Sequence, residues 1–194
     1  MTKNSIEVLK RYTIKIPKDI SIIYCENKKI LTFIGPQLKK SLKLTLKILL
    51  SKEKQLITVT SFPFSELSNN QKKKIKALQG TAVALIKQIF VEISTTLYKK
   101  LKFVGVGYKA FIVENFEKVI NLKLGFSHPI YFKISNELEL FCKKQTHLFI
   151  FGNSYQLVTN SAAKLRSLKK PEPYKGKGIL YTNEQIILKE GKKV

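Results

Sequence analysis

Short stretches in which apolar and polar residues alternate recur along this chain, in two blocks that each end in a single helical pattern. Alternation with a period of two is typical of half-buried strands, whereas apolar residues spaced by three and four indicate a helix. Strands that bury only one face need a covering layer. The pattern therefore predicts an α+β fold of two tandem homologous units, each a mostly antiparallel sheet packed against one long helix.

The first block has five expected strands, at residues 12–16, 20–24, 30–34, 42–50 and 56–61. The first three are short and separated by turn residues, which predicts a small antiparallel meander. Residues 68–70, Ser-Asn-Asn, can cap a helix that runs from about Gln71 to Lys99. One apolar stripe along that helix is expected to cover the meander.

The second block has expected strands at residues 101–113, 119–124, 130–134, 137–142 and 147–151. A second helix is expected from about Ser154 to Leu168, ending before Pro171. We place the domain boundary near residue 100, which gives units of 1–100 and 101–194. A chain of 194 residues is long enough for two such units to bury their own cores.

The two blocks also resemble each other residue by residue. The aligned positions, at an offset of 117 or 118, are 16–20 with 134–138, Cys25 with Cys142, and 31–35 with 148–152. Strands share composition, but the nearly constant offset favours a duplicated sheet-plus-helix unit.

The charge of the chain restricts its partners. Lys and Arg number 36 and Asp and Glu 13, which gives a net charge of +23. Such an excess opposes compaction unless a polyanion neutralises it, so nucleic acid or an anionic membrane is implied. No apolar stretch is long enough to span a bilayer, and no helix sets lysines opposite a broad apolar face, so we expect no membrane partner.

Residues that could carry catalysis are sparse. Asp19 is the only aspartate, and neither His128 nor His147 has a nucleophile or carboxylate nearby in sequence. Cys25 and Cys142 are far apart and lack metal-ligand spacing, so we interpret them as reduced core thiols. We therefore expect no enzymatic activity, no metal and no cofactor.

Two glycine- and turn-rich motifs are assigned to the fold. The segment Gly105-Val106-Gly107-Tyr108 completes neither a dinucleotide-binding nor a phosphate-loop motif, and a bulge or a close backbone approach explains its glycines better. Ser127, His128 and Pro129 read as a turn in which the histidine satisfies a backbone group.

The densest basic feature runs from Lys164 to Gly178. Its first cations suit the C-terminal end of the second helix, while its prolines and glycines favour an extended backbone that lies close to a phosphate chain. Tyr174 offers a stacking face. A solvated basic loop is the alternative. The predicted RNA-binding residues are Lys164, Arg166, Lys169, Lys170, Tyr174, Lys175, Gly176, Lys177 and Gly178, with Lys192 and Lys193 at the C-terminus.

Three segments together resemble the universal large-subunit ribosomal protein six family. They are LKFVGVGYKA at 101–110, LKLGFSHP at 122–129 and KPEPYKGKGILY at 170–181, and weaker similarity extends to both ends of the chain. The resemblance implies a non-catalytic protein of two tandem α/β units that binds large-subunit ribosomal RNA. Members of the family dock mainly through the second unit beside the sarcin-ricin loop, near the stalk base where elongation factors bind. Neighbouring large-subunit ribosomal proteins are therefore expected partners as well.

Other functions and the cellular location remain open from the sequence. A free nucleic-acid-binding or nucleoid protein would carry a similar charge, whereas a nucleic-acid-modifying enzyme would need the carboxylates that are missing here. Only two of the 36 basic residues are arginines, which indicates coding in an A+T-rich genome. Together with departures from the family pattern at 152–156, this bias favours the mitochondrial matrix, with a plastid or the cytoplasm of an A+T-rich organism as alternatives.

Overall fold

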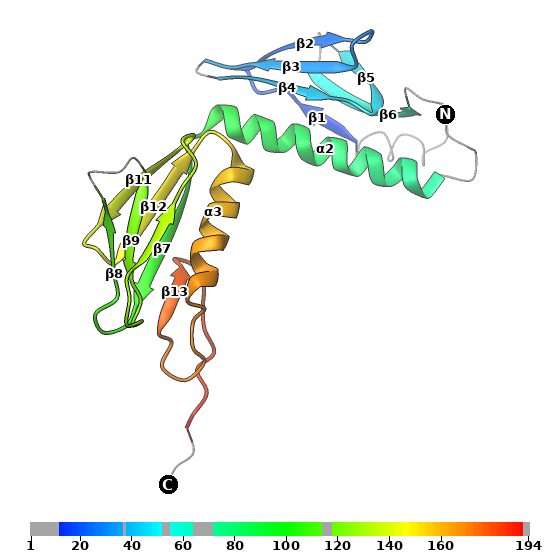
Figure 1. Cartoon of the computed structure of the whole chain (residues 1–194). Helices are drawn as coiled ribbons and strands as arrows, with labels where there is room; N and C mark the ends of the chain where they lie inside the picture. Colours follow the sequence, from blue (N-terminus) through cyan, green and yellow to red (C-terminus); the bar gives the residue numbers. More distant parts are fainter. Residues whose placement is uncertain (1–11, 37, 52–54, 64–71, 114–117, 192–194) are drawn as a thin grey trace. The chain divides into compact units, whose positions relative to one another are not determined.

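A computed structural model of the protein describes residues 12–36, 38–51, 55–63, 72–113 and 118–191. The chain divides into two compact units, Met1–Thr95 and Thr96–Val194. In the described residues each unit contains antiparallel sheets and one long helix (Figure 1). The predicted α+β class with two tandem sheet-plus-helix units is therefore confirmed, although each unit holds two small sheets rather than one.

The described residues of the first unit form six strands and one helix. They are β1 (Thr13–Lys15), β2 (Ser21–Cys25), β3 (Ile30–Ile34), β4 (Lys39–Lys43), β5 (Leu46–Ser51), β6 (Leu56–Pro63) and α2 (Lys72–Ser94). One sheet has the order β2-β3-β4 and the other β1-β6-β5. The predicted meander is thus wrong in its first strand, because β1 pairs with β6 and not with β2.

Alternating residues of the first unit point into one core, where Leu31 and Phe33 of β3 and Ile57 of β6 are fully buried. The helix α2 packs on the β1-β6-β5 sheet, and its Phe90 meets Phe33 edge-on with ring centroids 5.5 Å apart. The predicted capping residues 68–70 and the predicted start at Gln71 lie outside the described residues.

The helix α2 ends at Ser94, five residues before the predicted end at Lys99. The hydroxyl groups of Ser94 and Thr95 donate back to the carbonyls of Phe90 and Val91 at 2.7 and 2.8 Å. Leu97 continues the apolar spacing of the helix, but it already belongs to a strand of the second unit. The helical spacing of apolar residues therefore continued by coincidence to Leu97, which is an apolar position of the strand β7 and not of the helix.

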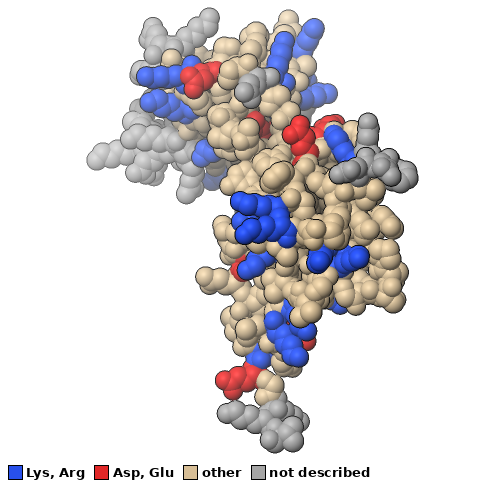
Figure 2. Space-filling view, turned by 90° about the vertical axis from the view of Figure 1, so that its left-hand side faces the viewer, with Lys and Arg blue, Asp and Glu red and all other residues tan. Residues whose placement is uncertain are grey.

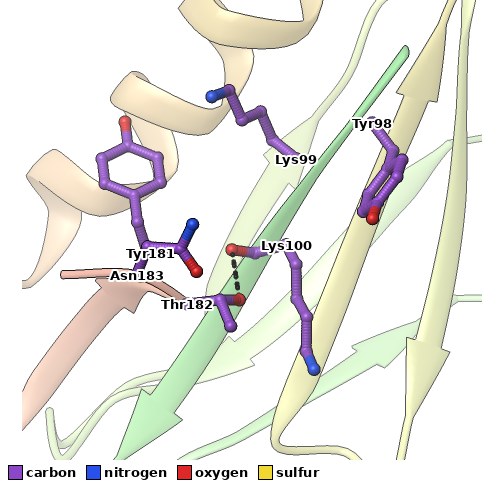
Figure 3. Close-up of a pocket in the computed structure, with 6 residues that line it drawn as sticks. All are labelled: Tyr98, Lys99, Lys100, Tyr181, Thr182 and Asn183. Carbon is purple, nitrogen blue, oxygen red and sulfur yellow. Dashed lines mark hydrogen bonds between the residues drawn. The ribbon is translucent and has the colours of Figure 1, made fainter.

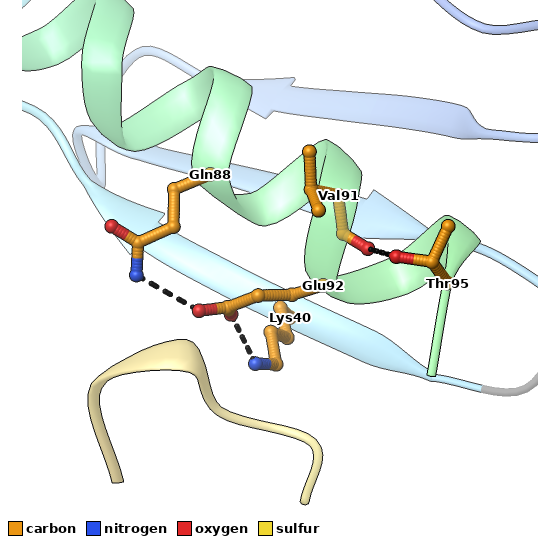
Figure 4. A network of polar contacts seen from close by, with 5 residues as sticks. All are labelled: Lys40, Gln88, Val91, Glu92 and Thr95. Atoms are coloured by element: carbon orange, nitrogen blue, oxygen red, sulfur yellow. Dashed lines mark hydrogen bonds and ion pairs between the residues drawn. The ribbon is translucent and has the colours of Figure 1, made fainter. Parts of the chain in front are cut away.

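A polar cluster fastens the last turns of α2 to β4 (Figure 4). The Nζ of Lys40 donates to the carboxylate of Glu92, which also accepts a 2.9 Å hydrogen bond from Gln88. Glu92 is buried, so its charge requires these donors.

In the second unit, the part of the chain that the structure describes forms seven strands and one helix. They are β7 (Leu97–Val104), β8 (Lys109–Ile112), β9 (Val119–Lys123), β10 (Ile130–Lys133), β11 (Leu138–Lys143), β12 (His147–Gly152), α3 (Tyr155–Leu168) and β13 (Gly178–Tyr181). The sheets have the orders β10-β9-β8 and β11-β12-β7-β13. The helix α3 buries Val158, Ala162 and Leu165 against the second of these sheets.

The proposed alignment of the two halves is wrong in its register. Cys142 lies in β11, which pairs with β12, the last strand before α3. The last strand before α2 is β6, and its partner is β5, whereas Cys25 lies in β2. The units correspond strand by strand in chain order, with sheet β5-β6-β1 matching β11-β12-β7. The hairpins have similar apolar compositions, so the residue match paired β2-β3 with β11-β12, although β5-β6 is the hairpin that corresponds to β11-β12.

Candidate nucleic-acid interface

Three segments that are distant in sequence meet at one end of the second unit. They are the turn 105–108 between β7 and β8, the turn 124–129 between β9 and β10, and the loop 169–177 that links α3 to β13. Strand pairing sets this arrangement, because Gly178 is the register partner of Val104, and Lys109 is the partner of Lys123. We call these three segments together the loop end of the second unit.

The buried ring of Tyr108 organises the first two turns. A Cβ atom at Gly105 would lie 2.9 Å from this ring, and one at Gly125 would lie 3.1 Å from it. Gly105, Gly107 and Gly125 also have φ values of +148°, +76° and +75°. Glycine is required at 105 and 125 because the backbone there passes close to an aromatic ring in a conformation that other residues rarely adopt, whereas at 107 only the positive φ favours it.

Lys169 joins the helix end to the second turn. Its Nζ lies 4.6 Å from the ring centroid of Phe126, within reach of a cation–π contact. Phe126 in turn stacks on His128 with centroids 6.0 Å apart. Ser127, His128 and Pro129 are exposed, as predicted for a turn, and His128 stacks on the Phe126 ring.

The loop 169–177 is compact rather than extended, which corrects the sequence-based expectation. The amide of Glu172 donates to the carbonyl of Lys177 at 2.9 Å, and the amide of Gly176 donates to the carbonyl of Glu172 at 3.0 Å. The amide of Ile179 donates to the carbonyl of Lys169 at the base of the loop. These bonds fold Pro173, Tyr174 and Lys175 into a turn at the tip.

Gly176 and Gly178 are buried, so they do not themselves present backbone to a partner. A side chain at Gly176 would face Leu188 and Ile186 of the C-terminal segment, at 3.6 and 4.0 Å. A side chain at Gly178 would collide with the backbone of Pro171, 2.6 Å away. The two glycines therefore shape the loop, and the lysines are left to make contacts.

Arg166 is held by an acidic residue that sequence analysis missed. Its guanidinium donates to both carboxylate oxygens of Glu184, with the Nε–Oε2 bond at 2.9 Å, and lies over the Tyr181 ring. The pKa of Glu184 is lowered and that of Arg166 raised, chiefly by this hydrogen bonding. Glu184 stands eighteen residues away with no helical spacing, so only the fold brings the pair together.

The remaining predicted RNA-binding residues differ in exposure. Lys164, Lys170, Tyr174 and Lys175 are exposed, whereas Lys169 and Lys177 are half-buried. Lys192 and Lys193 lie outside the described residues. Lys109 and Lys123 add two exposed cations beside the turns that were not predicted. Figure 2 shows one face of the molecule, on which Lys and Arg side chains gather in several clusters and Asp and Glu are few.

The described residues offer neither a metal centre nor a membrane-spanning helix. Within them, His, Cys, Asp and Glu side chains form no group of three or more that could hold a metal ion. Neither α2 nor α3 is long and apolar enough to cross a membrane.

The family model and the similar proteins all point to the same family. The sequence model described as Ribosomal protein L6 matches residues 104–182. The chain is similar to large ribosomal subunit protein uL6 of Mycoplasmoides gallisepticum, at 39% identity over 181 residues and 92% of each chain. It is equally similar to that of Mycoplasma genitalium, at 39% over 183 residues and 93% of each, and is 38% identical to that of Chlorobium phaeobacteroides over 162 residues, 84% of this chain and 85% of the relative. The chain therefore belongs to the ribosomal protein L6 (uL6) family.

Proposed function

We propose that this protein is a structural component of the large ribosomal subunit, and that it binds large-subunit ribosomal RNA through the loop end of the second unit. The observation that carries the proposal is the placement of Lys169, Lys170, Lys175 and Lys177 on one compact, hydrogen-bonded loop beside two aromatic turns. Lysines supply the salt-dependent contacts to phosphates, and exposed rings such as Tyr174 can stack on bases or riboses. The role needs no catalytic group.

The finer details rest on the family resemblance and are part of the proposal. The docking site would lie beside the sarcin-ricin loop near the stalk base, where elongation factors pass and neighbouring ribosomal proteins pack. The lysine bias, with 34 lysines among 36 basic residues, and the departures from the family pattern at 152–156 favour a mitochondrial ribosome, with a plastid or the cytoplasm of an A+T-rich organism as alternatives.

Removing two lysines from the loop tests the proposed contact. In a Lys175→Ala, Lys177→Ala variant we expect the slope of log K against log salt for ribosomal RNA binding to fall by about 2, because each lysine would neutralise about one phosphate. The affinity for RNAs of different sequence should fall by a similar factor, because phosphate contacts do not depend on sequence. The measurement is binding of the full chain to large-subunit RNA across a salt series.

The matched control removes the same charge elsewhere. A Lys73→Ala, Lys76→Ala variant changes two exposed lysines of α2, and we expect it to leave the slope nearly unchanged. Equal slopes for the two double variants would show that RNA binding depends only on the net charge of the protein, and the loop 169–177 would then have no special role. A parallel titration with duplex DNA separates this function from that of a nucleoid protein, which would bind both nucleic acids alike.

A further inference from the structure

One face of the β11-β12-β7-β13 sheet carries an aromatic cluster that the core does not use. The buried residues Leu101, Leu148 and Ile150 point toward α3 and the rest of the core. Since side chains alternate along a strand, their neighbours point to the opposite, outer face. The large outer-face side chains are Tyr98, Phe141, Phe149 and Phe151.

The four rings form a continuous surface across three strands. Phe141 lies 6.1 Å from Phe149, and Phe149 lies 6.2 Å from Phe151 with an interplanar angle of 12°. Tyr98 lies 5.9 Å from Phe151. Tyr98 and Phe141 are 57% and 55% exposed. An open apolar patch of this kind marks a surface that contacts a partner.

The pattern of β12 supports the same conclusion. Residues 147–151 read His-Leu-Phe-Ile-Phe, an almost unbroken apolar run that is typical of a strand covered on both faces. In the described residues of the second unit, the buried core cluster includes Leu148 and Ile150 but none of the four outer-face rings.

Cations surround the rings. Lys100 places its Nζ 5.3 Å from the centroid of the Phe149 ring. Lys102 and Lys143 flank His147 as its register partners on the two neighbouring strands. The pKa of His147 is lowered, first by burial and then by these lysines, as expected where positive charge collects. Glu139, beside Phe151 on β11, is the acidic residue of this face in the described strands.

A pocket opens where the ring cluster meets the end of β13. It has a volume of about 310 Å³ and is lined by Tyr98, Lys99, Lys100, Tyr181, Thr182 and Asn183 (Figure 3). Lys99 and Lys100 extend to opposite sides of β7, and Thr182 fixes the rim by donating to the carbonyl of Lys100 at 3.2 Å. The Tyr98 ring and the Lys100 ammonium group, on the outer side of β7, can contact a base and its phosphate.

We propose that this outer face binds a segment of single-stranded RNA, whose bases stack on Tyr98, Phe141, Phe149 and Phe151 while phosphates contact Lys100, Lys102 and Lys143. A partner of the opposite charge fits the lysines, and open rings on a sheet fit unpaired bases, which present π-faces regardless of sequence. A neutral apolar protein surface would leave those lysines unpaired. The face is a second RNA contact, separate in its residues from the loop end.

The test uses the full chain and a fluorescein-labelled decauridine RNA, measured by anisotropy. In a Tyr98→Leu, Phe141→Leu variant the charge and the apolar character are retained and only the stacking faces are lost. We expect decauridine affinity to fall roughly tenfold or more, since each stacked base contributes to binding. A Tyr98→Phe, Phe141→Tyr variant, which keeps the rings, should bind as the natural sequence does.

Two comparisons make the result specific. The leucine variant should bind a ten-base-pair RNA duplex unchanged, because paired bases cannot stack on the rings. The Lys175→Ala, Lys177→Ala variant should bind large-subunit RNA more weakly, with the smaller salt slope given above, while keeping the ring-dependent difference with decauridine. The inference and the proposed function can therefore fail separately. Unchanged decauridine affinity in the leucine variant would overturn the inference, as would an equal loss with the duplex.

Discussion

Replacing Gly178 by alanine is expected to lower the free energy of unfolding of the second unit by about 2–5 kcal/mol, because the change combines backbone strain with a steric clash. Gly178 has a φ of +151°, and a Cβ there would lie 2.6 Å from the Cα of Pro171 and 2.8 Å from the carbonyl oxygen of Lys170. Both contacts are to backbone atoms, so no side chain can turn aside. Calorimetry should show the melting temperature falling by roughly 8 °C or more.

Gly80 provides the matched control. It lies in α2 with open space around its missing Cβ, so Gly80→Ala should raise stability by about 0.5–1 kcal/mol through helix propensity. The damage at Gly178 should also loosen the loop 169–177 and weaken RNA binding more than the loss of one lysine does. A Gly178→Ala protein with an unchanged melting temperature would contradict the close contact between the backbones of Gly178 and Pro171.

Replacing Glu92 by alanine is expected to lower the free energy of unfolding of the first unit by about 2–4 kcal/mol, because it removes a buried carboxylate that pairs with Lys40 and accepts from Gln88. The side chain of Glu92 is 5% exposed and that of Lys40 is 23% exposed, so water can compensate only in part. Removing one partner of a fully buried pair costs about 3–5 kcal/mol, and the residual exposure of Lys40 reduces that value. Chemical denaturation of the full chain measures the change.

Two variants decide whether charge is the cause. Glu26→Ala removes an acid whose 3.1 Å pair with Lys47 is largely exposed, and it should change stability by no more than about 0.5 kcal/mol. A Lys40→Met, Glu92→Leu protein replaces both charges by apolar groups and should recover most of the loss. If the double variant is as unstable as Glu92→Ala alone, packing and not charge explains the effect.

The strands with strict alternation could be predicted from the sequence, because burial on one face dictates the pattern. β3 and β9, for example, alternate cleanly and lie where expected. The expected strand 42–50 instead divides into β4 and β5, since alternation continues unbroken through Leu44 while the backbone turns. The amide of Leu44 donates to the carbonyl of Lys29 at 2.7 Å, a contact between distant residues that no local pattern contains.

The candidate site was found in part. Its lysines were visible as a charge cluster, but the shape of the loop was not, because Pro171, Pro173 and the glycines read as an extended chain. β13 was missed since Gly178–Tyr181 is short and follows this segment directly. Phe126 belongs to the segment 122–129 that resembles the family, but the sequence analysis assigned it no role. Only the pairing of strands brings it beside Lys169.

The most direct test of the central claim is sedimentation of the natural protein from cells in which it is tagged at its chromosomal locus. After a high-salt wash and a sucrose gradient, we expect it to co-sediment with the large ribosomal subunit in about one copy per particle, and the Lys175→Ala, Lys177→Ala variant to be released at lower salt. Recovery of the natural protein at the top of the gradient, or with DNA, would contradict the account.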